Sequence, residues 1–181
     1  MKKLNEASII EIFQKSLGKK KFVSEDVEFF NIGKTRIFTK IDTLVQSTDI
    51  PPKMKLSDAS RKSIVACISD FAAKGIKPKY GVISINLPKS ISRSKIDEIV
   101  KGFKKASKEF DIEILGGDTN EGKEIVLNVC IFGESKDFVS RKGSKEKDII
   151  FVTGPFGYTA LGLKMILEEK QNKVKIVKKS I

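Results

Sequence analysis

The sequence predicts a two-layer α/β fold in which a sheet packs against helices. Segments rich in β-branched and aromatic residues alternate along the chain with segments whose apolar residues recur at helical spacing. Glycines, prolines and short polar stretches separate these segments. The chain has 181 residues, of which 40% are hydrophobic, so it is long enough for one well-packed domain and part of a second.

The first half of the chain predicts a helix, two strands and a second helix. Apolar residues at helical spacing predict a helix over residues 4–17. The stretch VEFFNIGKTRIFTKIDTLV predicts two strands around a turn at 31–34. The paired prolines of STDIPPKMKLSD predict a loop, and a helix over 58–74 follows it with Ser57 as the N-cap.

The second half continues with a strand, a helix and two more strands. These segments carry the sequences YGVISINLP, SRSKIDEIVKGFKKASKEF, DIEILGG and EIVLNVCIFGE. The stretch DTNEGK, residues 118–123, has the residue types of a hairpin loop, so we expect a turn between the last two strands.

The pattern changes at Asp148. The stretch DIIFVTGPFGYTALGLKMILEE predicts a strand, a glycine turn and a helix. One strand and one helix cannot close a core of their own. We therefore expect an N-terminal domain over residues 1–137 and the start of an incomplete second domain over residues 138–181.

The formal net charge of +12 makes the chain basic. Its lysines are scattered along predicted helix faces, which favours a solvated surface that attracts small polyanions. The tail KQNKVKIVKKS, residues 170–180, is a basic cluster and leaves nucleic-acid or acidic-membrane binding through it open. No apolar run reaches the roughly 20 residues of a membrane span. We expect no membrane partner, and small polyanions in preference to nucleic acid.

Two residue types narrow the chemistry. The chain has no histidine, which excludes histidine triads, histidine-ligated zinc and an imidazole base. Its two cysteines, Cys67 and Cys130, lie in apolar segments and predict buried free thiols. We therefore expect a cytoplasmic protein whose chemistry depends on carboxylates, basic groups, hydroxyls or a bound metal.

Four aspartates predict an oxygen-rich site. Asp70 shares a helix face with small residues. Asp26 lies in a polar loop just before a predicted strand, Asp42 ends a predicted strand, and Asp118 follows paired glycines. Taken singly, each also fits a structural role as a loop-bonding, turn, strand-end or hairpin residue. Together they predict that the acids converge around a hard cation such as Mg²⁺, which binds nucleotide phosphates.

Four blocks of the sequence resemble the thiamine-monophosphate kinase family, especially its archaeal-type members. The blocks are KIDTLVQSTDIPP, SDFAAKGIKP, LGGDTNEG and VSRKGSKEKDIIFVTGPFGYTALGL. The family is similar to aminoimidazole ribonucleotide synthetase and selenophosphate synthetase, and the resemblance implies their N-terminal fold and a homodimer whose sheets form a barrel. It also implies transfer of the γ-phosphoryl group of ATP onto thiamine monophosphate, giving thiamine diphosphate.

The resemblance assigns roles residue by residue. It implies Mg²⁺ ligands, ATP contacts and one substrate contact: Asp26, Asp42, Asp70 and Asp118 for the metal; Gly117, Asp118 and Arg141 for ATP; and Asp49 where bacterial members often have a substrate-contacting histidine. No side chain is expected to act as acid, base or nucleophile, because positioning and charge neutralisation suffice for an anionic phosphate acceptor.

Several positions depart from the family pattern. Glu25 replaces an aspartate, Ile41 replaces a threonine, and Lys74 replaces a methionine and is expected on the surface. A further Ser-Asp-Gly block that completes the family's site is not in this sequence. We therefore expect a fragment with little turnover of its own. The alternative is a non-catalytic dimerising remnant or a basic module that binds polyanions.

Overall fold

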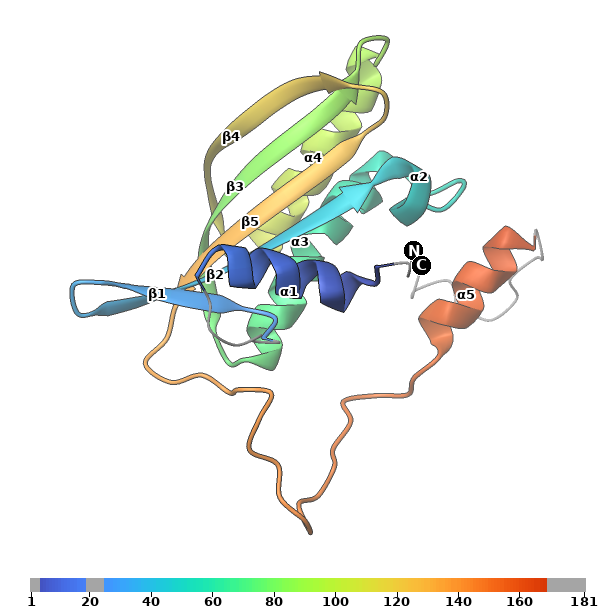
Figure 1. Ribbon diagram of the computed structural model, residues 1–181. Helices are drawn as coiled ribbons and strands as arrows, with labels where there is room; N and C mark the ends of the chain where they lie inside the picture. The colour runs from blue at the N-terminus through green and yellow to red at the C-terminus, as the bar shows by residue number, and fades with distance from the viewer. Residues whose placement is uncertain (1–3, 19–24, 169–181) are drawn as a thin grey trace.

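The computed structural model describes residues 4–18 and 25–168 and confirms the predicted α/β class (Figure 1). Its centre is a five-stranded sheet in the order β1 (Glu28–Ile32), β2 (Thr35–Val45), β5 (Val126–Glu134), β3 (Lys77–Pro88) and β4 (Glu113–Gly122). The pair β3–β4 is parallel, and the other neighbouring strands are antiparallel. Two long helices, α3 (Leu56–Ala73) and α4 (Arg93–Phe110), pack together on one face of this sheet.

Strand alternation decides which residues form the core. Alternate residues of β5, Leu127, Val129 and Ile131, are completely buried under the helices. Phe38 of β2 and Phe71 of α3 are buried in the same layer. The neighbours of the buried strand residues point to the opposite face, so each strand divides its residues between a helix-covered face and an open face.

Small residues let α3 lie close to both of its neighbours. A Cβ at Gly102 of α4 would come within 2.0 Å of the Ser57 carbonyl oxygen, so only glycine permits this helix–helix contact. On the sheet side, the thiol of Cys67 donates to the carbonyl of Val129, with 3.3 Å between sulfur and oxygen. The small-residue face predicted for α3 is therefore a packing surface, and Asp70 lies one turn beyond Cys67.

The structure corrects the expected hairpin between the last two strands. DTNEGK is not a turn, because β4 runs through Gly122 beside β3. Strand β5 lies between β2 and β3, so the chain crosses past β3 to reach it. Asp118 is therefore a mid-strand residue. The sequence pattern could not reveal this order, since polar residues are tolerated on a strand that has one exposed face.

Three smaller predictions also change. Helix α3 begins at Leu56, and its N-cap is Lys55, which makes no side-chain capping bond, in place of Ser57. A one-turn helix, α2 (Gln46–Asp49), occupies part of the expected loop. No strand forms at residues 148–152, where Ile150 is 91% exposed, although a helix does follow as α5 (Tyr158–Leu167).

The ends of the described chain carry helices with little buried surface. Helix α1 (Glu6–Ser16) is confirmed and begins with a capping box at Asn5, yet none of its residues is buried. Helix α5 buries only Gly162 and is joined to the sheet by a long extended segment (Figure 1). No described helix is both long and apolar enough to cross a membrane. The basic tail at 170–180 lies outside the described residues.

Candidate functional site

Two of the predicted aspartates meet at the junction of β2 and α3. Asp42 faces the helices from β2, and Asp70 reaches toward the same strand from α3. Between them lies Lys40, whose Nζ is 2.9 Å from Oδ2 of Asp70 and 3.9 Å from Oδ2 of Asp42. Lys40 and Asp42 are two residues apart on one strand and so share its helix-covered face. The structure therefore places Asp42 and Asp70 around the same ammonium group, whereas their role as metal ligands stays a prediction.

The electrostatics of this cluster favour a charged Lys40. Its side chain is only 21% exposed, and burial acts to lower the pKa of the ammonium group. The hydrogen bond and charge of Asp70, together with the charge of Asp42, outweigh burial and raise the pKa of Lys40 above its ordinary value. Nearby Cys67 has its pKa raised to about 12, mainly by burial, so it is an uncharged packing thiol.

A second charged cluster lies at the C-terminal end of α3 and contains Asp26. Arg141 Nη1 donates to Oδ1 of Asp26 at 3.3 Å, so the predicted ATP contact and a predicted metal ligand lie side by side. The preceding residue, Glu25, accepts hydrogen bonds from Lys74 Nζ, from the Ser140 hydroxyl at 2.6 Å and from the Arg141 backbone N–H. Glu25 thus ties the start of β1 and the segment after β5 to helix α3.

The structure overturns the expectation that Lys74 lies on the surface. Lys74 is 4% exposed, and Glu25 is its ion-pair partner. The hydrogen bond from Lys74 is the largest cause that lowers the pKa of Glu25 to about 2, and the Ser140 hydroxyl adds to it. A buried ammonium needs such a partner. Glu25 and Lys74, two of the three departures from the family pattern noted above, are therefore a matched pair.

The glycines before Asp118 shape the edge of the sheet. Gly116 has φ +156°, a value that favours glycine, and a Cβ on Gly117 would come within 1.6 Å of the carbonyl oxygen of Ile83. Both glycines help line a largely apolar cavity of about 310 Å³ between β4 and α4. Val100 and Phe103 line it from the helix side. Backbone groups of 116–119 are thus presented to an apolar cavity.

Asp118 itself is not beside the other aspartates within one chain. The register aligns it with Ser84 of β3, Asn128 of β5 and Thr43 of β2, all on the open face, whereas Asp42 is on the helix-covered face. Three strand spacings separate Asp118 from Thr43, about 14 Å in all. Across residues 4–18 and 25–168, no three acidic or cysteine side chains gather closely enough to hold a metal ion. The expected four-aspartate cluster therefore does not form within this chain.

Asp49 has a local structural role. Its Oδ2 accepts the backbone N–H of Val45 at 2.7 Å and the hydroxyl of Thr48 at 3.1 Å. The side chain therefore fixes the turn from β2 into α2. A substrate contact by Asp49 stays a prediction.

Sequence reasoning missed Lys40 and the contacts of Glu25. One available signal was the two-residue spacing from Lys40 to Asp42, which puts both on one face of a strand. The four-residue spacing from Asp70 to Lys74 would have misled, because Asp70 pairs with Lys40 and Lys74 with Glu25. No sequence signal links Glu25 to Ser140, because 115 residues separate them.

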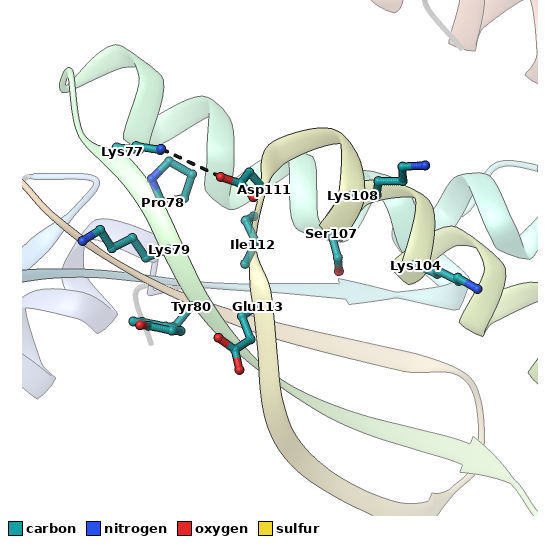
Figure 2. A pocket seen from close by; sticks show the side chains of 10 residues that line it. All are labelled: Lys77, Pro78, Lys79, Tyr80, Lys104, Ser107, Lys108, Asp111, Ile112 and Glu113. Atoms are coloured by element: carbon teal, nitrogen blue, oxygen red, sulfur yellow. Dashed lines mark ion pairs between the residues drawn. The ribbon is translucent and has the colours of Figure 1, made fainter.

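The cavity of about 660 Å³ drawn in Figure 2 is a weaker candidate. It carries four lysines, but Lys104 and Lys108 extend away from it along α4, and Lys77 is directed to Asp111, with 3.9 Å between their charged atoms. Lys79 is likewise paired with an acid, Glu134. The positive charges therefore do not converge on one anion position.

Comparisons with known proteins agree with this geometry. Residues 24–135 match the family described as AIR synthase related protein, N-terminal domain. The chain is 62% identical over all of its 181 residues to a thiamine-monophosphate kinase of Nitrosopumilus maritimus and covers 57% of that protein. The expected likeness to thiamine-monophosphate kinases is confirmed.

Solved structures give the same result. A structure described as AaThiL complexed with AMPPCP and TMP superposes with a TM-score of 0.89 at 27% identity, over 99% of this chain and 58% of that one. Thiamine monophosphate kinase from Aquifex aeolicus gives a TM-score of 0.86 at 26% identity, over 98% and 59%. The chain thus spans less than two thirds of the length of these proteins. It belongs to the AIR synthase-related family and carries that family's N-terminal domain.

Proposed function

We propose that this chain is the nucleotide- and metal-binding part of a thiamine-monophosphate kinase. The whole enzyme would move the γ-phosphoryl group of ATP onto the phosphate of thiamine monophosphate. The relative from Nitrosopumilus maritimus has this name, and the structure described as AaThiL carries AMPPCP and TMP. The observation that carries the proposal is the meeting of Asp42 and Asp70 around one cation.

The donor set at β2 and α3 fits Mg²⁺. Mg²⁺ prefers oxygen ligands and is commonly held by one or two carboxylates together with substrate phosphates and waters. Asp42 and Asp70 supply two carboxylates that already share a cation and remain partly exposed. Asp26, beside Arg141, would bind metal at the second cluster. When bound, the metal would neutralise the charge that develops on the phosphates.

The cavity between β4 and α4 fits the base of ATP. Its lining is mostly apolar, as base-binding cavities usually are. The backbone at Gly117 is uncovered by any side chain and would approach the nucleotide, while Asp118 would bind its metal. Arg141, positioned by the Glu25 cluster, would contact the phosphates.

A homodimer would cover the open face of the sheet, on which Asp118 lies. In a single chain about 14 Å separates Asp118 from the Asp42 region, as the strand spacing shows. On the open face of the sheet, the side chains of Ile41 and Tyr80 are 64% and 44% exposed. Large exposed apolar side chains of this kind are typical of a surface that contacts another protein chain. We propose that this face forms the dimer, in agreement with the barrel that the family resemblance implies.

Chemistry of this kind needs no histidine. The acceptor phosphate is already an anionic nucleophile, so the protein has to hold it in line with the γ-phosphorus and neutralise charge. In this chain, Asp42 and Asp70 would orient the cation and Arg141 would stabilise the phosphates. We place the reaction in the cytoplasm, where ATP is present and free thiols stay reduced.

Residues 138–181 would open a second domain, as the sequence predicts. Since the chain covers 57% of its relative, the substrate side of the site would lie in the rest of the enzyme. We therefore expect Mg²⁺-dependent ATP binding by the 181-residue chain with little turnover.

Calorimetric titration with ATP, with and without Mg²⁺, tests the proposal. Asp70→Asn removes a proposed metal ligand and should weaken Mg²⁺-dependent binding about tenfold or more. Asp97→Asn is the matched control, because Asp97 is an exposed acid of α4 paired with Arg93 at 2.9 Å. Binding that ignores Mg²⁺ and falls steeply with added salt would contradict the kinase assignment and favour the basic polyanion-binding module.

A further inference from the structure

We infer that the ammonium group of Lys40 is a built-in counter-ion that takes the place of one divalent cation between Asp42 and Asp70. This inference rests on the proposed function, because it concerns two aspartates proposed there as metal ligands. The new element is that the chain itself supplies one of the cations of that site, the ammonium group of Lys40.

The position of Lys40 is that of an ion shared by two carboxylates. Its Nζ lies 2.9 Å from Asp70 and 3.9 Å from Asp42, and the three side chains come from only two elements. The backbone of Lys40 is held in the ladder opposite Ile131 of the central strand β5. Strand alternation then directs its side chain to the helix-covered face. The location of the charge therefore follows from the fold.

Among the residues that the structure describes, Lys40 is the cation paired with Asp70. The other lysine near the end of α3, Lys74, is buried and committed to Glu25. The side chains of Asp42 and Asp70 are 38% and 28% exposed, so an ion from solvent can reach them. The ammonium lies against the Oδ2 atoms of both carboxylates and keeps a further divalent ion from lying there, while their other oxygens stay open to the nucleotide-bound Mg²⁺ proposed above.

Simple electrostatics sets the consequence. Two carboxylates that face one gap repel each other, and a cation between them removes that repulsion. A lysine ammonium does this with one charge and three donors. A divalent ion that entered the same gap would be repelled by the ammonium at close range. The chain should therefore bind fewer divalent ions at this position than its carboxylates would allow.

The test measures Mn²⁺ binding to the 181-residue chain without nucleotide, by electron paramagnetic resonance of the free ion. Lys40→Met and Lys40→Gln remove the charge and keep most of the side-chain volume. Each should gain a further Mn²⁺ site, at least about tenfold tighter than binding by the wild type. Adding Asp70→Asn to Lys40→Met should abolish the gained site. Lys79→Met, which removes a lysine paired with Glu134 elsewhere, should gain none.

Each outcome decides the inference. Folded Lys40 variants that bind Mn²⁺ no better than the wild type overturn it. A variant that folds only when Mn²⁺ is added supports it, because the metal then replaces the lost ammonium. Variants that stay unfolded even in millimolar Mn²⁺ overturn it, because the metal then cannot replace the lysine. The measurement contains no ATP, so failure of the kinase proposal would leave this result standing.

Discussion

Replacing Glu25 by glutamine should strongly destabilise the domain. Glutamine keeps the shape of Glu25 and its ability to accept hydrogen bonds, and loses only the negative charge. What remains is the ammonium group of Lys74, which is 4% exposed. A buried cation without its counter-ion costs far more than a broken surface pair.

Two estimates give the expected loss in the free energy of unfolding. Breaking a buried ion pair by removing one partner costs about 3–5 kcal/mol. The pKa of Glu25 lies at about 2 against an ordinary value of 4.5, and that gap corresponds to about 3 kcal/mol of stabilisation of the charged form. Since the substituted glutamine would still accept the Ser140 hydroxyl, we expect a loss of about 3 kcal/mol in the free energy of unfolding, at the lower end of the range.

Acid pH gives the same prediction an internal control. A carboxyl whose pKa is lowered on folding adds stability that is fully present above its unfolded pKa and is lost as the pH falls through its folded pKa. For Glu25 that window runs from 4.5 down to about 2. The difference between wild type and Glu25→Gln should therefore be complete at pH 6 and should shrink steadily as the pH approaches 2.

Urea denaturation followed by circular dichroism measures these quantities. Lys74→Met removes the buried charge, leaves Glu25 its other donors and should cost about 1 kcal/mol. The double variant should be close to Lys74→Met alone, so the coupling energy of the pair should be about 3 kcal/mol. A Glu25→Gln protein within about 0.5 kcal/mol of the wild type, or strictly additive changes, would refute the argument.

Three further predictions concern packing. Gly117→Ala should destabilise the domain by about 2 kcal/mol or more, because its Cβ would lie 1.6 Å from the carbonyl oxygen of Ile83, whereas Gly154→Ala, with nothing within 4 Å, should be neutral in urea melts. Phe71→Ala should cost about 3–5 kcal/mol in the same assay, because this side chain is completely buried. Asp49→Ala should lower the free energy of unfolding by about 1 kcal/mol, because the backbone N–H of Val45 in β2 would lose its acceptor. Unchanged stability would contradict the structural role of Asp49.

The sequence predicted the elements of this fold better than their neighbours in the sheet. Hydrophobic spacing located helices α1, α3 and α4 and the strands of the sheet, because periodicity reports which faces are buried, but it ended β4 too early and predicted a strand at 148–152 that does not form. It could not place β5 between β2 and β3, because strand order depends on contacts between distant segments. The polar stretch around Asp118 has the composition of a turn, since an open sheet face tolerates the same residues that turns use.

The candidate site divides along the same line. The sequence grouped Asp42 with Asp70, although Asp42 lies within β2, three residues before its end, and not at the strand end expected. The Glu25 cluster could not be predicted, because it joins three segments through contacts that leave no periodic signal. Lys74 illustrates the limit clearly: a charged residue at a helix end normally points to solvent, and only its partner's location explains why it is buried.

Charge balance explains how the domain can keep its acids close together before any metal binds. Asp70, Asp42 and Glu25 all lie near the last two turns of α3, where uncompensated carboxylates would repel one another. Lys40 offsets one of the two charges of Asp42 and Asp70, and Lys74 offsets that of Glu25; both lysines are largely buried. Asp26 is instead paired with the more exposed Arg141. The side chain of an exposed arginine can change its rotamer to bind a phosphate at little cost. The side chain of Lys40 cannot, because its backbone is fixed in the sheet and its ammonium group is paired beneath helix α3. The second cluster is therefore the adaptable side of the proposed site, and the β2–α3 junction is its fixed side.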